Sequence, residues 1–291
     1  MKYIEKNPII MIIIGVIGIS LSSIFVKYSS APSSVTAAYR LLWTVLILSP
    51  AVWGKRGVRQ ELLNVDKKTL LLSALSGVFL AVHFVLWFES LSHTSVASST
   101  TIVCTEVVWV ALGFVLFLKG RISKKAVLAI GITLLGSVLI AFADAGGENN
   151  LYGDVLALLA AVAVAVYMLL GRVVRKNTST TVYTYIVYVA CAITLVIMCA
   201  FSKASLFAYG YSAPVVGLLL AVFSTILGHS IFSWCLKFFS PSFVSASKLC
   251  EPVVAAILAG ILFAEVPRML QLIGGALVLG GVYYYSRIEK E

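Results

Sequence analysis

Charged side chains are scarce in this sequence. Asp, Glu, Lys and Arg make up 12% of its 291 residues, whereas hydrophobic residues make up 60%. Soluble globular domains carry about 25% charged and about 45–50% apolar residues. Because so little polar surface cannot cover a water-soluble protein of this length, the composition excludes a cytosolic enzyme, a nucleic-acid-binding domain and a disordered chain. It predicts an all-α integral membrane protein.

The sequence also lacks the patterns that bind nucleotides or metals. No G-x-x-x-x-G-K-[ST] motif occurs, so we do not expect ATP to power the protein directly. The cysteines lie inside apolar segments without the spacing of metal ligands, which is typical of small buried side chains. We therefore expect no metal and no cofactor. The five cysteines are Cys104, Cys191, Cys199, Cys235 and Cys250.

Long apolar stretches are abundant. A helix needs about 20 apolar residues to cross about 30 Å of hydrocarbon, and ten stretches approach or exceed that length. They are residues 9–26, 35–53, 70–91, 96–118, 125–143, 153–171, 181–201, 214–239, 244–263 and 269–286. The connections between them are short. The sequence therefore predicts ten transmembrane helices with no soluble domain between them.

Positive charge gathers at alternate connections between these stretches. If the N-terminus is cytoplasmic, 17 of the 22 Lys and Arg residues fall on the cytoplasmic side. The positive-inside rule then predicts that both termini are cytoplasmic, and the basic side also suits contact with anionic lipid headgroups. The net charge of +10 is accordingly attributed to membrane orientation and not to nucleic-acid binding.

Residues 91–106 match residues 236–251 at a constant offset of 145, which superimposes Glu106 on Glu251. Ten spans divide into two sets of five, and an odd number in each set means that the second set enters the membrane upside down. Inverted repeats of this kind are common in secondary transporters with a site near the midplane. We predict repeats over residues 1–146 and 147–291. Four glycines share a spacing in the two repeats: Gly131, Gly136, Gly275 and Gly280.

Three motifs in order along the chain carry a family resemblance. AAYRLLWT holds Arg40 in the second span, CEPVVAAILAGILFAEVP holds Pro252 and Glu265 in the ninth, and LIGGALVLGGVYYY forms the tenth. In these motifs the chain resembles the ten-span EamA branch of the drug/metabolite transporter superfamily. It departs from that family's usual pattern at Lys119-Gly120 and at Glu89. The resemblance implies transport across a bacterial inner (plasma) membrane, with export favoured, and it implies cargo ranging from amino acids and nucleosides to amines and drugs.

A charged residue inside a membrane span is costly and therefore marks a candidate site. Glu106 lies near the middle of the fourth span, on a helical face that also carries Trp109. We expect Glu106 either to bind a cationic group or to carry a proton; the alternative is a structural carboxylate paired with hydroxyls or with Lys248. Glu251 and Lys248 are three residues apart in the ninth span, which allows them to pair on one helix face. Pro252 predicts a kink beside them.

The remaining candidate residues are Arg40, two histidines and a tryptophan. His83 and His229 lie in the third and eighth spans, where histidine can couple transport to protons or can simply pack with a hydrogen-bonded ring. Arg40 is expected to have a structural or gating role, or to hold a carboxylate. Trp87 and Trp109 are the two tryptophans deep enough to line a pocket, where an aromatic wall binds organic cations.

These features favour a secondary transporter that works by alternating access, and not an enzyme or a channel. Charges of both signs favour zwitterionic amino acids as cargo, with Lys248 or Arg40 on the carboxylate and Glu106 on the ammonium group. The alternative cargo is a cationic amine or quaternary ammonium compound held by Glu106 and tryptophan. Proton coupling is compatible with either, as are a monomer and a homodimer.

Overall fold

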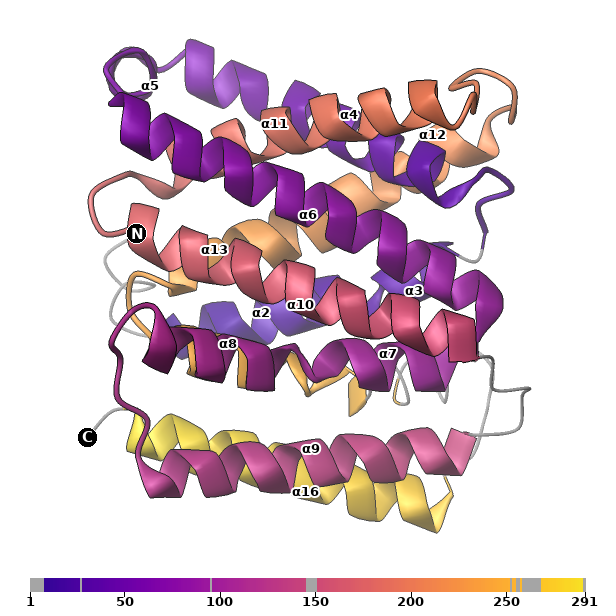
Figure 1. Ribbon diagram of the computed structural model, residues 1–291, viewed down its shortest axis with the longest axis vertical. Coiled ribbons are helices and arrows are strands. Elements are labelled where there is room, and N and C mark those ends of the chain that lie inside the picture. The colour runs from indigo at the N-terminus through magenta and orange to yellow at the C-terminus, as the bar shows by residue number, and fades with distance from the viewer. Residues whose placement is uncertain are drawn as a thin grey trace.

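The computed structural model describes residues 8–26, 28–94, 96–144, 151–251, 253, 254, 257 and 268–289. Every regular element within these residues is a helix, and the long helices lie side by side along one direction (Figure 1). The elements are α2 (Pro8–Ser20), α3 (Ser22–Val26), α4 (Ser33–Trp53), α5 (Arg56–Leu63), α6 (Lys67–His93), α7 (Val96–Cys104), α8 (Glu106–Leu116), α9 (Lys124–Asp144), α10 (Leu151–Val174), α11 (Thr180–Phe201), α12 (Ser212–Leu219), the π-helix η1 (Leu220–Ser230), α13 (Ile231–Cys235), α14 (Pro241–Lys248) and α16 (Met269–Ile288).

Eight helical stretches within the described residues are long and apolar enough to cross a membrane. They confirm the prediction of an all-α chain with many membrane spans, although α9, at the predicted span 125–143, is not among them. Residues 252, 255, 256 and 258–263 of the predicted span 244–263 lie outside the described residues, and the kink predicted at Pro252 lies outside them too.

The short connections make successive long helices run in opposite directions. As a result, one side of the bundle, at the left of Figure 1 where α5 lies, holds the C-terminal ends of α4 and α16 and the N-terminal ends of α6 and α9. The basic connections predicted from the sequence therefore gather at this end. Asp66 caps α6 there: the Thr69 amide donates a hydrogen bond of 3.0 Å to its carboxylate, and the hydroxyl and the amide of Thr69 together lower the pKa of Asp66.

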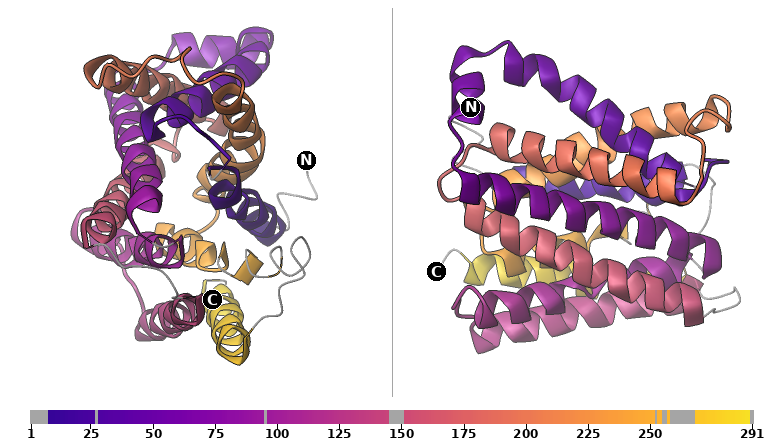
Figure 2. Two further views of the ribbon diagram at one scale, coloured as in Figure 1. Left: turned by 90° about the vertical axis from the view of Figure 1, so that its right-hand side faces the viewer. Right: turned by 45° about the horizontal axis from the view of Figure 1, so that its top comes forward.

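Helices α9 and α16 pack closely against each other at one edge of the bundle (Figure 2). A Cβ atom on Gly136 would lie 2.6 Å from the carbonyl oxygen of Gly274, so only glycine allows the two backbones to approach this closely. Gly131 and Gly280, two of the four glycines matched in the sequence, instead face open space. Of the glycines in the close contact, the shared spacing therefore included Gly136 but not its partner Gly274.

Two helices break at equivalent positions of the predicted repeats. Between α7 and α8 the Thr105 amide donates to the carbonyl of Ile102 at 3.0 Å, and after α14 the Cys250 amide donates to the carbonyl of Ser247 at 3.2 Å. Both are bonds to the third preceding residue, which tighten the helix locally. Thr105 and Cys250 are separated by the same 145 residues as the sequence match. Each break immediately precedes a glutamate, Glu106 or Glu251.

The eighth predicted span contains an 11-residue π-helix, η1. Two hydroxyl groups reach carbonyls five residues earlier: Thr225 Oγ1 donates to Leu220 O, and Ser230 Oγ donates to Thr225 O, each at 3.2 Å. π-Helical turns are rare and frequently occur at functional sites. This one brings Thr225 and His229 to the interior of the bundle, where both side chains are buried.

Candidate functional site

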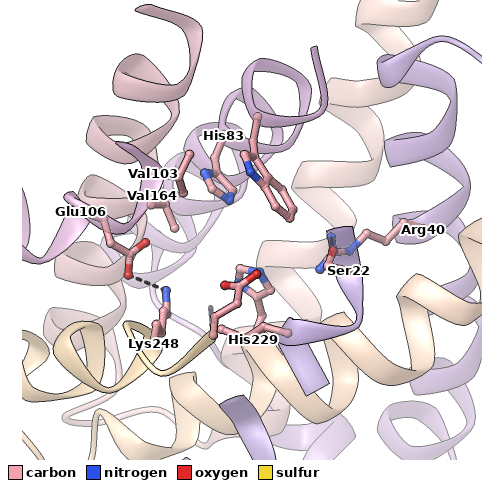
Figure 3. A pocket seen from close by; sticks show the side chains of 11 residues that line it. Ser22, Arg40, His83, Val103, Glu106, Val164, His229 and Lys248 are labelled. Carbon is pink, nitrogen blue, oxygen red and sulfur yellow. Dashed lines mark hydrogen bonds and ion pairs between the residues drawn. The ribbon is translucent and has the colours of Figure 1, made fainter. Parts of the chain in front are cut away.

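A cavity of about 40 Å³ lies inside the bundle, between elements of both predicted repeats (Figure 3). Seven of the eight site residues predicted from the sequence line it. The lining residues are Ile19, Ser22, Arg40, His83, Trp87, Val103, Glu106, Val164, His229, Lys248 and Glu251. Two carboxylates and two cationic side chains thus face one small space that apolar helices surround.

An ion pair joins elements of the two predicted repeats on one side of the cavity. Lys248 Nζ on α14 lies 2.9 Å from Glu106 Oε1 on α8, and Ser245 Oγ donates to the same oxygen at 3.1 Å. Lys248 also lies 3.4 Å from Met168 Sδ and 5.5 Å from the centre of the Phe232 ring. Because both charged groups are buried, their mutual attraction must offset a large desolvation cost.

Arg40 lies across the cavity from this ion pair (Figure 3) and is only 1% exposed. Its Nε donates to Thr225 Oγ1 at 2.7 Å, and its Nη1 donates a longer bond of 3.4 Å to Ser22 Oγ. The guanidinium carbon lies 4.0 Å from the centre of the Phe84 ring. Arg40 is therefore held by neutral hydroxyls and an aromatic face. This geometry leaves open the expectation that it holds a carboxylate.

Aromatic rings form the wall between the charged groups. His83 stacks on Trp87 with ring centres 6.1 Å apart and an angle of 11°, and its Nδ1 lies 3.0 Å from the carbonyl oxygen of Ala160. The ring of His229 lies 6.4 Å from that of His83 and 5.9 Å from that of Tyr167. The indole Nε1 of Trp87 is buried without a hydrogen-bond partner in the described structure.

Glu251 does not form the ion pair with Lys248 that their spacing allows. The ammonium group of Lys248 points across the helix interface to Glu106 instead, and the helix breaks at Leu249 and Cys250 between the two residues. These contacts agree with the alternative expectation for Glu106, a structural carboxylate paired with hydroxyls or with Lys248. Within the described residues, Glu251 Oε1 is buried and has no hydrogen-bond partner. The two pseudo-equivalent glutamates therefore have different environments.

Trp109 is the one predicted site residue that lies away from the cavity. Its side chain is 37% exposed on the outside of α8. The buried stripe of α8 instead runs through Glu106, Val110 and Gly113. Val110, four residues after Glu106, occupies the inward position, and Trp109 lies beside this stripe.

The sequence reasoning missed several polar contacts of the site. Ser245 precedes Lys248 by three residues, so helical spacing alone offered a signal that the two share a face. Thr225 and Ser22 carried no such signal, because their contacts to Arg40 depend on the π-helix and on a break between α2 and α3. None of these side chains is charged, and a search for costly residues in membrane spans therefore does not find them.

The cavity lining consists of charged, aromatic and apolar side chains with one hydroxyl group. Among the residues that the structure describes, no three His, Cys, Asp or Glu side chains lie close enough together to hold a metal ion. The five cysteines are all unpaired thiols, and four of them are buried. What the cavity offers is a set of charges, indole and imidazole rings, and a hydroxyl group.

Comparison with known proteins gives the family. The sequence model of the EamA-like transporter family matches twice, over residues 6–142 and 151–287. An uncharacterized transporter of Archaeoglobus fulgidus is 26% identical over 260 residues, which cover 85% of each chain. The uncharacterized transporter YxxF of Bacillus subtilis is 26% identical over 282 residues, covering 95% of this chain and 87% of YxxF.

One relative has a named cargo. The pseudopaline exporter CntI of Pseudomonas aeruginosa is 21% identical over 288 residues, which cover 98% of each chain. A solved structure, described only as the crystal structure of a protein, shares the fold with a TM-score of 0.79 at 17% identity, and the likeness covers 98% of each chain. The family match extends over nearly the whole sequence and confirms the resemblance carried by its motifs. The chain belongs to the EamA-like transporter family.

Proposed function

We propose that this membrane transporter is a secondary carrier of small zwitterionic metabolites, with amino acids as the first class of cargo. The observation that carries the proposal is a cavity inside an apolar bundle that is lined by two carboxylates, one lysine and one arginine. Burying four ionisable groups among membrane helices is costly, and such groups typically mark a substrate or ion pathway. A ligand with both charges matches a site with both charges.

Alternating access accounts for the small size of the cavity. Its volume of about 40 Å³ is far below the roughly 300–1,000 Å³ typical of ligand pockets. Helices must therefore move apart to admit a metabolite. The cavity lies between residues of the proposed repeats 1–146 and 147–291, so a rocking motion of one repeat against the other would open it from either side.

The distribution of basic residues supports an orientation for this carrier. One end of the bundle carries most of the lysines and arginines, and we propose that this end, with both termini, faces the cytoplasm at the inner (plasma) membrane. The relative CntI is named as a pseudopaline exporter, which favours export as the direction. The buried histidines His83 and His229 make protons the proposed coupling ion.

Cationic amines or quaternary ammonium compounds are the second candidate cargo. The observation that favours them is the carboxylate of Glu251, which lines the same cavity as the Trp87 ring. An aromatic face together with a carboxylate is a common way to bind organic cations. In this case Arg40 would have no ligand group to bind.

Thermal unfolding of the detergent-purified protein tests the proposal. A ligand that binds only the folded form raises its stability, by about 2.7 kcal/mol at a hundredfold excess over the dissociation constant. We expect stabilisation by a subset of the twenty amino acids, and saturable flux of those compounds into proteoliposomes. Stabilisation by amines alone would move the assignment to the second cargo class, and no response to either panel would contradict both.

A further inference from the structure

The cavity holds two positive and two negative side chains, and only one opposite pair is joined within the described residues. Building on the proposed function, we infer that Arg40 and Glu251 bind the carboxylate and ammonium ends of the cargo. Glu106 and Lys248 form a structural link between the two repeats and do not bind the cargo. This assignment differs from the expectation that Glu106 receives the ammonium group.

The first step is that the groups of the Glu106–Lys248 pair already have partners. Glu106 Oε1 accepts from both Lys248 Nζ, at 2.9 Å, and Ser245 Oγ, at 3.1 Å. The ammonium group of Lys248 is further surrounded by Met168 Sδ and the Phe232 ring. A ligand bound there would first have to break a buried ion pair, and the separated charges would lose their main stabilising contact.

The second step is that Arg40 forms no direct ion pair with a carboxylate in the described structure. The ion pairs found among the described residues are Lys248–Glu106 and Glu89–His93, and Arg40 takes part in neither. Its two hydrogen bonds go to hydroxyl groups, and the bond to Ser22 is long at 3.4 Å. The forked guanidinium matches a carboxylate with two parallel hydrogen bonds, which are stronger than bonds to neutral acceptors.

The third step is that the unsatisfied hydrogen-bonding capacity lies with other cavity residues. Glu251 Oε1 and Trp87 Nε1 are both buried, and neither has a partner among the described residues. Leaving a buried polar group unpaired is unfavourable. An ammonium group supplies donors to the carboxylate of Glu251, and a polar atom of the cargo can accept from the indole N–H of Trp87.

Together these contacts specify the chemical class of the cargo. The Glu106–Lys248 pair balances its own charge, which leaves one cation and one anion facing the cavity: Arg40 and Glu251. A molecule with one carboxylate and one ammonium group neutralises both. An amine alone leaves Arg40 without a counter-ion, and a carboxylic acid alone leaves Glu251 without one. The site therefore prefers zwitterions to either singly charged analogue.

The test compares three ligands on four proteins by thermal-shift titration. The ligands are the amino acid that stabilises the wild-type protein most, its decarboxylated amine and its 2-hydroxy acid. The proteins are the wild type, Glu251→Gln, Arg40→Lys and the double variant Glu106→Gln/Lys248→Met. Arg40→Lys retains the positive charge but loses the forked donor, and the double variant removes the ion pair without leaving either charge unpaired.

On the wild type, removing either charged group of the ligand should weaken binding on the order of 10- to 100-fold, the worth of a hydrogen bond to a charged group. In Glu251→Gln the amino acid and the hydroxy acid should bind almost equally, because the partner of the ammonium group is gone. In Arg40→Lys the difference in affinity between the amino acid and the amine should become smaller. The double variant should retain both affinity differences of the wild type, that between the amino acid and the amine and that between the amino acid and the hydroxy acid.

Three outcomes distinguish a failure of this assignment from a failure of the proposed function. If the affinity differences persist in Glu251→Gln and disappear in the double variant, the cargo binds to Glu106 and Lys248. In that case this assignment is overturned while the proposed function stands. If Arg40→Lys does not fold, the Glu251→Gln comparison alone decides the ammonium site in the same way. If no amino acid binds the wild-type protein, the proposed function itself fails.

Discussion

Glu106 and Glu251 occupy matching positions in the two predicted repeats, 145 residues apart, and each follows a break in its helix. Their surroundings differ completely. Glu106 Oε1 accepts from Lys248 and Ser245, whereas Glu251 Oε1 is buried without a partner in the described structure. Each predicted repeat thus places one carboxylate in the cavity, and the side chains around each carboxylate give it a different environment. We propose structural linkage for the first and ligand binding for the second.

The largest effect is expected from removing the charge of Glu106. Glu106→Gln leaves the buried ammonium group of Lys248 without its counter-ion, and breaking a buried ion pair in this way costs about 3–5 kcal/mol of the free energy of unfolding. Chemical unfolding of the purified protein measures the loss. The double variant Glu106→Gln/Lys248→Met should regain a substantial part of it, and additive losses would show that the pair contributes no coupling.

The next effect concerns the last helices of the two repeats, α9 and α16. A Cβ atom on Gly274 would lie 2.7 Å from the backbone oxygen of Gly136, so Gly274→Ala should cost about 1–3 kcal/mol of unfolding free energy. Gly131→Ala and Gly280→Ala are matched controls, because nothing lies within 4 Å of a Cβ atom at either position. Equal losses in all three variants would disprove the close contact.

A smaller effect of the opposite sign is expected from Glu251→Gln. The substitution replaces a carboxylate whose buried Oε1 has no partner among the described residues by a neutral amide of the same shape, so the free energy of unfolding should stay the same or rise by about 1 kcal/mol. In the same unfolding experiment, the free energy of unfolding should therefore fall for Glu106→Gln but not for Glu251→Gln. A loss as large as that of Glu106→Gln would mean that Glu251 has a structural partner, and the comparison between the two glutamates would fail.

The smallest effect lies at the start of the third span of each repeat. Asp66 caps α6 through Thr69, whereas Tyr211, 145 residues later, precedes α12 without a side-chain cap. The cap lowers the pKa of Asp66, so its contribution to stability is present above the unfolded pKa of about 4 and is lost as the pH falls through the lower folded pKa. Asp66→Asn should slightly flatten the pH dependence of unfolding in that acid range, whereas Tyr211→Phe should not.

The sequence predicted the membrane class and the family because both depend on composition and on motif order. It also predicted most of the cavity, because charged residues such as Arg40 and Lys248 are costly in apolar spans unless they face the interior. Spacing along the chain did not decide the pairing of charges, because the sequence left Lys248 free to pair with Glu251 or with Glu106. Lys248 is three residues from Glu251 along the chain, but it contacts Glu106 on another helix.

Two further features depended on backbone geometry that the sequence does not display. The π-helix η1 directs Thr225 toward Arg40, and no residue pattern announced it. Trp109 was predicted to share a face with Glu106, yet the buried stripe of α8 passes beside it and leaves the indole 37% exposed. Small shifts of helical register therefore decide which aromatic residues reach the site.

Counterflow in proteoliposomes tests the central claim most directly. Vesicles loaded with an unlabelled amino acid that stabilises the wild-type protein should take up the radiolabelled form transiently, and this exchange requires binding on both sides without any ion gradient. The account predicts counterflow by the wild type and by Glu106→Gln/Lys248→Met, and its loss in Glu251→Gln. Counterflow that survives in Glu251→Gln but disappears in the double variant would contradict the assignment of the two glutamates.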